Sequence, residues 1–338
     1  MRTMITEAIT EHPSGSPDVA QGGRRTWLDY AEQYGIYLAL VALIVTFSLA
    51  SPFFLTTRNL ANVGNAAAIT GVLAAGMTIA LIAGQLDLSV GSVLALTSVA
   101  GAVFVQSWGL SWPAAIVLVF LIAALVAVLN GVLIVNLAIN SIITTLAISI
   151  ALRGLAQMVG DGQVVPVTAD TWLQEAVNAR PLGVPVPLIV LLLVYAGTWI
   201  FLNKLRSGWH VYAIGGNPNA ALRAGVRVNR ITRGVFIATA AMAAIGGVLT
   251  LGRAGSGSGI YGNGVEFDVL TAVLLGGIGM GGGSGRIEKT LAGVLLIGVL
   301  NNGMTLLNFN SYHQQLARGL VFVLAVVLSA LAIKKRAR

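Results

Sequence analysis

Cysteine is absent from the 338-residue sequence, which excludes disulfide frameworks and thiol catalysis. Charge is scarce as well: Asp, Glu, Lys and Arg together make up 9% of the chain, whereas hydrophobic residues make up 56%. So few charged side chains cannot cover the surface of a soluble protein of this length. The mean hydropathy of +0.85 likewise indicates a chain that is mainly apolar. The composition therefore predicts a membrane protein.

Two enzymatic motifs are also missing. A phosphate-binding loop is absent, because Lys289 and Thr290 follow Glu288 and not glycine, so the chain itself is expected to bind neither ATP nor Mg²⁺. The run from Gly282 to Gly285 matches the G-x-S-G of rhomboid-type proteases. Its nearest histidine, His313, follows a predicted helix about 30 Å long. No catalytic serine–histidine pair forms over that distance, so we expect no catalytic residues, and we identify no metal site.

Long apolar runs fill most of the chain. Because each backbone polar group must be paired inside hydrocarbon, these runs predict an all-α polytopic protein whose spans need roughly 20 residues each. About ten spans are expected, at residues 34–51, 66–83, 89–106, 112–135, 141–158, 186–202, 234–251, 267–280, 287–307 and 314–333. The segment 267–280 is short, and the glycine-rich run from Gly276 to Gly285 disfavours a continuous helix. A broken or half-spanning helix is predicted there.

The ends of the chain differ from this apolar body. Residues 1–33 are polar and predict a mobile cytoplasmic tail and not a cleavable signal, because the first long apolar run starts only near Tyr34. Residues 34–333 form the predicted membrane domain. Residues 334–338 form a basic C-terminus.

Lys and Arg are distributed unevenly among the loops. Loops expected inside the cell carry Lys204, Arg206, Arg223, Arg227, Arg230, Arg233, Arg286 and Lys289, besides the basic C-terminus. Loops expected outside carry the acids Asp161, Asp170, Glu175, Glu266 and Asp268 with fewer basic residues. This asymmetry predicts that both termini are cytoplasmic. It also explains the net charge of +8 without nucleic acid as a partner.

One cytoplasmic loop, 203–233, is much longer than the others. We expect a turn at Gly215 and Gly216, then a short helix that Asn217 or Asn219 caps and that Gly225 ends. Such a helix, displaying basic side chains, fits a docking element for a partner protein. It equally fits an interfacial helix that rests on the headgroups of anionic membrane lipid.

Four stretches, which follow the family's order along the chain, resemble the permeases of ATP-binding-cassette (ABC) importers, and most closely their monosaccharide branch for ribose, xylose, arabinose and autoinducer-2. They are Asn219-Ala220-Ala221 with Gly225, GQLDLSVGS at 84–92, the Leu152–Leu155 region, and GGGSGRIEKTLAGVLLIGVLNNGMTLL at 281–307. The first departs from the loose Glu-Ala-Ala pattern of the family's coupling loop, because Asn219 replaces the Glu. Together they cover roughly residues 50–333.

The resemblance implies a permease subunit in the bacterial inner membrane, with a cytoplasmic coupling helix. The implied partners are an ABC ATP-binding protein that carries ATP and Mg²⁺, a periplasmic or lipid-anchored sugar-binding protein, and a second permease copy or homologous permease. Alternating access is the implied mechanism. The residues expected to couple to the ATP-binding protein are Gly216, Asn219, Ala220, Ala221, Arg223 and Gly225.

Polar residues inside spans are the candidates for the transport path, because a buried polar group costs about 1–3 kcal/mol unless it is paired. Asp87 and Ser89 predict either a broken segment that lines or gates the path, or a simple cap of the following helix. The neutral candidates, which suit sugar hydroxyls or equally helix-to-helix hydrogen bonds, are Asn65, Asn130, Thr144, Asn301 and Asn302, and Thr145 shares their character.

Three charged residues near the outer ends of helices also have two interpretations. Arg153 either donates to sugar hydroxyls or extends to the membrane interface. Glu266 and Asp268 either contact the binding protein or are first-turn acids that favour the helix dipole.

The principal rival is a secondary transporter driven by an ion gradient. Such a carrier generally needs carboxylates or a histidine deep in its spans, and Asp87 is the single acid in the sequence with a partly embedded position. A channel, which should show a repeated filter segment, is the second rival.

Overall fold

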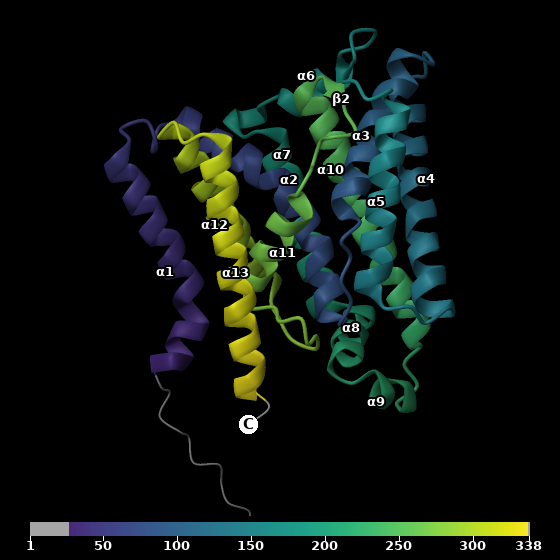
Figure 1. Ribbon diagram of the computed structural model, residues 1–338, viewed down its shortest axis with the longest axis vertical. Helices are drawn as coiled ribbons and strands as arrows, with labels where there is room; N and C mark the ends of the chain where they lie inside the picture. The colour runs from purple at the N-terminus through teal and green to yellow at the C-terminus, as the bar shows by residue number, and fades with distance from the viewer. Residues whose placement is uncertain (1–26, 337–338) are drawn as a thin grey trace, which may run out of the picture. The chain divides into compact units, whose positions relative to one another are not determined.

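The computed structural model describes residues 27–336, and the side chains of residues 34–331 (Figure 1). Backbone contacts divide the chain into residues 1–35 and residues 36–338. The described part of the first unit, residues 27–35, is helical and opens α1, so the helix begins ahead of predicted residue 34. The rest of the predicted tail, residues 1–26, lies outside the described residues, as do Ala337 and Arg338 of the predicted basic C-terminus.

The described residues contain thirteen α-helices, one π-helix, one 3₁₀ turn and two short strands. Their bounds are α1 Trp27–Ala50, α2 Thr57–Ile82, α3 Val90–Gln106, α4 Trp112–Gly131, η1 Val132–Asn136, α5 Ser141–Val159, β1 Val165–Pro166, α6 Trp172–Asn178, η2 Pro181–Gly183, α7 Val186–Lys204, α8 Arg206–Gly216, α9 Pro218–Arg223, α10 Val228–Ala254, β2 Ser256–Gly257, α11 Val265–Leu275, α12 Ile287–Leu306 and α13 Ser311–Arg336. The strands β1 and β2 pair antiparallel.

Each of the ten predicted segments overlaps one of these helices. Seven helices in the described part of the chain are long and apolar enough to span a membrane: α2, α4 continued by η1, α5, α7, α10, α12 and α13. Two shorter apolar helices cover residues 34–50 and 90–106. The all-α membrane architecture is confirmed, and the count of ten spans stays a prediction.

The predicted half-helix is α11. Its 11 residues rise about 16 Å at 1.5 Å per residue, roughly half of the ~30 Å hydrocarbon core. The chain then runs without helix to Arg286, and Gly277, Gly282 and Gly283 in this run have positive φ. Glycine tolerates these values at no steric cost, which explains why the helix stops there.

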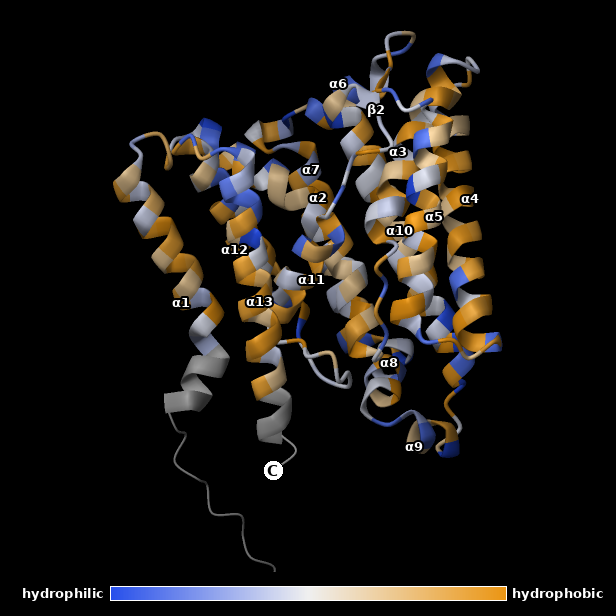
Figure 2. Ribbon diagram, viewed as in Figure 1, coloured by the Kyte–Doolittle hydropathy of each residue, from blue (hydrophilic) through white to orange (hydrophobic). Residues whose placement is uncertain are grey.

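Helices α2, α3 and α10 form the centre of the second unit. In the most apolar stretch of α2, 78% of the residues are buried, against 11% in α13. Small residues permit this packing, since a Cβ at Gly246 of α10 would press on Leu73, and one at Gly247 on Thr97. Helices α4, α5, α7 and α13 carry many exposed apolar side chains, and the ribbon of α4 is mostly orange in Figure 2. These faces fit contact with lipid.

The long loop differs from its prediction in one respect. Gly215 and Gly216 are not a turn but the last residues of α8, an 11-residue helix that the sequence analysis missed. Val211 and Ile214 are buried on it, so tertiary packing outweighs the low helix propensity of its glycines. The helix ends before Asn217, whose backbone is extended, and Asn217 caps α9 through a 3.0 Å bond from Ala220 N to its side-chain oxygen.

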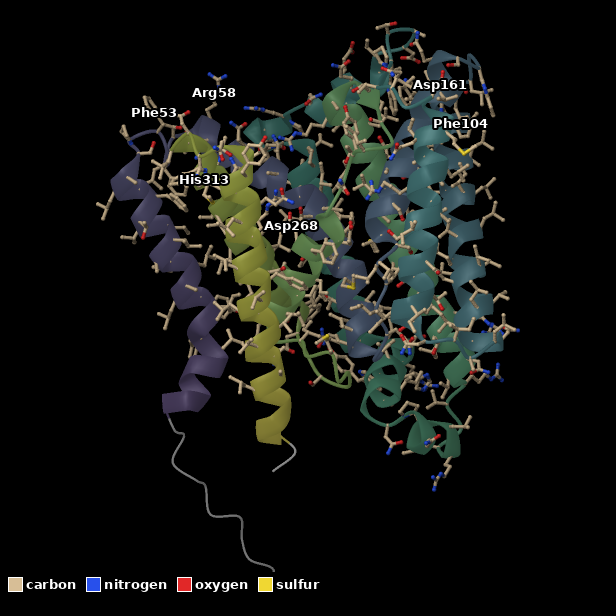
Figure 3. All side chains as sticks on the ribbon, in the orientation of Figure 1. Phe53, Arg58, Phe104, Asp161, Asp268 and His313 are labelled. Carbon is tan, nitrogen blue, oxygen red and sulfur yellow. The ribbon has the colours of Figure 1, made fainter. Side chains whose placement is uncertain are left out.

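Two opposite ends of the second unit are useful landmarks. Helices α8 and α9 lie at one end, and α6 with β2 at the other (Figure 1). We call these the α9 end and the α6 end. Asp161 lies at the α6 end (Figure 3).

Candidate functional site

The non-helical segment 83–89 between α2 and α3, which we call the Asp87 loop, is held by its own carboxylate. Asp87 is 1% exposed. Its Oδ1 accepts hydrogen bonds from Ser89 N at 3.0 Å and from Ser89 Oγ. Its Oδ2 accepts one from Thr239 Oγ1 of α10. Ser89, at the N-cap position of α3, makes no side-chain capping bond. The carboxylate therefore fastens the loop to α10 and does not directly cap α3.

Two further helices bind the same loop. From α5, Ser141 Oγ accepts a bond from Leu86 N at 3.3 Å, and Thr145 Oγ1 accepts one from Leu88 N at 3.0 Å. From α4, Asn130 Nδ2 donates to Ser89 Oγ at 3.2 Å. The Asp87 loop is thus a buried polar connection between α4, α5 and α10. Movement of any of these helices must disturb its hydrogen bonds.

The predicted path residues fall into separate groups. Asp87, Ser89 and Asn130 meet at the loop. Thr144 is buried on α5, and its hydroxyl has no hydrogen-bond partner; the side-chain oxygen of Asn130 has none either. Both oxygens are buried acceptors whose hydrogen-bonding capacity is unused within the chain. Whether any of these residues touches a transported molecule stays a prediction.

The asparagines of α2 and α12 form the second group. Asn302 and Asn59 exchange two amide hydrogen bonds, each 2.9 Å long. This reciprocal pair is the helix-to-helix bond expected as the alternative to a path role, and Asn59 was not among the candidates. The side-chain oxygens of Asn65 and Asn301 have no hydrogen-bond partner.

Glycines bring three backbone segments together next to the Asp87 loop. They are the end of α2 at Ile82 to Gly84, the end of α8 at Gly215 and Gly216, and the loop before α12 at Gly282 and Gly283; we call this the glycine junction. Gly283 N donates to Ile82 O at 2.8 Å. A Cβ at Gly215 would coincide with Ile82 O and press on Gly283 N. No residue except glycine fits there without displacing a backbone.

A tyrosine reinforces this junction. Tyr212 of α8 donates its hydroxyl hydrogen to Gly285 O at 3.0 Å. Burial is the main cause that raises the pKa of Tyr212, and the nearby negative charge of Glu288 adds to it, so the hydroxyl keeps its proton. Helix α8 is therefore hydrogen-bonded to the loop before α12 as well as packed against it.

Beyond the junction, α9 is displayed to its surroundings. Of the predicted coupling residues, Gly216, Asn219, Ala220, Arg223 and Gly225 are exposed, and only Ala221 is buried, at 5% exposure. Leu222, which was not predicted, is 62% exposed on the same helix. Gly225 has a φ of +83°, which L side chains rarely adopt. The helix is thus anchored by one alanine and presents a mixed apolar and basic surface.

Toward the α6 end, Arg153 holds a different loop. It donates to Tyr261 O at 2.8 Å, to Gly262 O at 3.2 Å and to Gly259 O at 3.4 Å. Glu266 approaches it to 3.9 Å. Asp268 pairs with Arg318 of α13 at 3.1 Å. All three charged residues named from the sequence, Arg153, Glu266 and Asp268, thus have partners inside this chain. A contact of Glu266 or Asp268 with a binding protein stays a prediction.

Replacing Arg153 with alanine is expected to loosen the loop at 259–262. Hydrogen bonds to a charged group contribute about 1.5–3 kcal/mol, so amide hydrogen exchange in this loop should accelerate by about tenfold. Hydrogen exchange followed by mass spectrometry measures this. Arg253→Ala, an exposed arginine nearby in sequence, is the control. Equal exchange rates in the two variants would show that Arg153 does not order the loop.

Sequence reasoning missed Thr239, Ser141, Asn59 and the role of Gly215. Thr239 lies 152 residues from its partner Asp87. No local pattern identifies such a pair. The glycine junction had a weak signal, because glycine pairs occur at 215–216 and at 282–283, but only packing shows that they meet.

Comparisons with known proteins found a matching family and several similar sequences. Residues 59–327 match the family described as "Branched-chain amino acid transport system / permease component". The chain is 37% identical to the ribose import permease protein of Bacillus subtilis (strain 168) over 298 residues, covering 88% of this chain and 92% of that protein. It is 34% identical to the L-arabinose transport system permease protein of Escherichia coli (strain K12), covering 95% and 96%.

A further similar protein is the ribose import permease protein of Escherichia coli (strain K12), which is 35% identical over 310 residues and covers 90% of this chain and 94% of its own length. No solved structure is significantly similar to this chain.

Proposed function

Because the chain belongs to the family of branched-chain amino acid transport system permease components, we propose that it is the membrane-spanning subunit of an ATP-driven importer for a monosaccharide or similar small polyol. Its relatives named for ribose and L-arabinose support the sugar class. Their names describe transport permeases and not enzymes, so this chain is a transport subunit. ATP hydrolysis then belongs to a separate ATP-binding partner.

The observation that carries the proposal is the position of α9. This short helix is displayed at one end of the molecule, and the preceding helix α8 ends in the glycine junction beside the Asp87 loop. A protein that displaces α9 also displaces α8, whose Gly215 packs against the backbones of Ile82 and Gly283. Through these two backbone contacts the displacement reaches the Asp87 loop, the buried polar connection between α4, α5 and α10. The exposed Leu222 and Arg223 suit an apolar and charged partner surface.

The charge distribution supports a cytoplasmic position for the α9 end. Of the basic residues in the inward loops of the prediction, Lys204, Arg206, Arg223, Arg227 and Arg230 all lie on or beside α8 and α9. Short cytoplasmic loops collect such residues. In the proposed arrangement the ATP-binding partner binds from the cytoplasm, and the α6 end faces the opposite side, where a periplasmic or lipid-anchored sugar-binding protein delivers cargo.

Alternating access then has a specific route through the chain. Closure of the ATP-binding partners moves α9 and α8, and the glycine junction passes this displacement to the Asp87 loop. The hydrogen bond between Asp87 and Thr239 and the one between Leu88 and Thr145 then break, which lets α5 and α10 rearrange around the path. Asn130 and Thr144 offer unpaired oxygens to sugar hydroxyls as the path opens. A second permease copy or a homologous permease completes the path.

Reconstitution in liposomes tests this function. The chain, together with its ATP-binding partner and its binding protein, is expected to import radiolabelled ribose or arabinose only when ATP is present on the partner's side. Leucine serves as the competing cargo, since the family description names branched-chain amino acids. ATP-driven import of leucine without sugar import would overturn the sugar class. Uptake by this chain alone, driven by an ion gradient, would favour the secondary transporter.

Bulky residues at the anchor of α9 are expected to uncouple ATP hydrolysis from uptake. Ala221→Trp has no room on the buried side of the helix, and Gly225→Trp adds about 1–2 kcal/mol of backbone strain at positive φ. We expect sugar uptake to fall more than tenfold while membrane insertion is unchanged. Uptake and phosphate release are measured on the same liposomes. Normal uptake with tryptophan at both positions would refute the coupling role.

A further inference from the structure

A half-open cavity of about 430 Å³ lies between α7, α8 and α10, away from the groups assigned to transport. It extends along α10 from Arg230 to Met242, which is about 18 Å at 1.5 Å per residue. This length is close to half of the ~30 Å hydrocarbon core, that is, to the depth of one leaflet. The lining is mainly apolar side chains and glycine, which suits a hydrocarbon chain and offers a sugar few partners.

The polar residues of the cavity lie where a phospholipid needs them. Arg230 is exposed at the first turn of α10, and within the described part of the chain its guanidinium has no hydrogen-bond or ion-pair partner. In the neighbouring cavity of about 310 Å³, by contrast, Arg233 donates to Asn136 Oδ1 at 3.0 Å. The larger cavity thus combines an apolar groove with an uncommitted cation at its mouth. An arginine of this kind matches a phosphate.

A second polar group points to a ligand independently. Thr198 of α7 lines the cavity and is only 3% exposed, yet its hydroxyl has no hydrogen-bond partner. A buried hydroxyl without a partner costs about as much as a lost hydrogen bond. The ester carbonyl of a phospholipid is an acceptor that would satisfy it.

We propose that this cavity binds one acyl chain of an anionic membrane phospholipid, with its phosphate at Arg230, an ester carbonyl at Thr198, and its chain along α10 toward Met242. The lipid fills the space between α7 and α10 directly beside α8. It therefore stabilises the arrangement of the helix that leads into α9. The proposal depends on the membrane location of the chain and not on the transported sugar.

Two glycines make a sharp test possible. A Cβ at Gly234 of α10 meets nothing within 4 Å, so Gly234→Leu introduces a side chain that occupies part of the cavity. Leucine is also a better helix former than glycine, so this variant is expected to fold. Its matched control is Gly319→Leu on α13, because a Cβ at Gly319 also meets nothing within 4 Å and Gly319 lines neither of these two cavities. Arg230→Gln removes the cation, and Arg253→Gln is its control.

The full chain, purified in mild detergent, is titrated with phosphatidylglycerol, phosphatidylethanolamine or inorganic phosphate, and bound lipid is counted by native mass spectrometry alongside thermal melting. We expect the wild type to retain one phosphatidylglycerol more tightly than phosphatidylethanolamine. Gly234→Leu should lose it, Arg230→Gln should bind it about fivefold more weakly, and both controls should behave as the wild type.

Three outcomes would overturn the proposal. The first is equal retention of phosphatidylglycerol by the wild type and Gly234→Leu. The second is equal stabilisation by inorganic phosphate alone, which would assign Arg230 to a free anion. The third is loss of a dimer in Gly234→Leu with unchanged lipid binding, which would show that a second copy of the chain covers the cavity.

Discussion

Gly215→Ala is expected to reduce ATP-driven sugar uptake to below a tenth of the wild-type rate. Its new methyl group would coincide with the carbonyl oxygen of Ile82 and press on the amide of Gly283, so the hydrogen bond between these two groups cannot persist. Overpacking of this kind costs about 1–3 kcal/mol, and about 1.4 kcal/mol is a factor of ten in an equilibrium. If the glycine junction transmits movement from α8 to the Asp87 loop, separating its backbones must break that link.

Gly319 of α13 is the matched control. A Cβ at Gly319 meets nothing within 4 Å, and alanine favours the helix over glycine. Gly319→Ala should therefore fold and transport as the wild type does. Uptake and ATP hydrolysis are measured on the reconstituted complex, with size exclusion and thermal melting to confirm folding. Wild-type uptake by a folded Gly215→Ala variant would show that the junction is not on the transmission route, whereas hydrolysis without uptake would support it.

Asp87→Ala is expected to lower the free energy of unfolding by about 3 kcal/mol and to remove most of the uptake. The substitution leaves the buried donors of Ser89 and Thr239 without their shared acceptor, and an unsatisfied buried polar group costs about 1–3 kcal/mol. Without the carboxylate, the Asp87 loop loses its bond to α10. The proposed connection from α8 to α4, α5 and α10 is then broken at the Asp87 loop.

Graded variants separate this structural role from direct contact with cargo. Asp87→Asn keeps one acceptor oxygen and should lose about half as much stability, roughly 1.5 kcal/mol. Asp161→Asn is the control and should change neither quantity, because Asp161 is an exposed acid at the α6 end and asparagine tolerates its positive φ. Thermal melting gives the stability, and uptake at varied sugar concentration gives KM and the maximal rate. A raised KM with an unchanged melting temperature would contradict the positioning role and indicate sugar contact.

Several features were correctly predicted from local sequence. The half-helix at α11 follows from its short apolar run and from the glycine-rich segment after it. Helix α9 follows from Asn217, Pro218 and Gly225, which supply a cap, a first-turn proline and a left-handed end. Helix α8 was missed, because its two terminal glycines indicated a turn while its burial depends on distant residues. Local sequence patterns predict local conformation, and they fail where packing against distant residues decides whether a segment is helical.

The sequence by itself determined that this protein spans a membrane, that it is helical, and that its long basic loop carries a short helix, because apolar run length, backbone pairing, capping residues and charge placement are properties of single stretches of chain. Only the tertiary structure decided which polar groups meet. It paired Asp87 with Thr239 and Asn59 with Asn302, and it brought Gly215 against Ile82. Such pairs lie far apart in the chain, so the packing of helices, and not the order of residues, makes them neighbours.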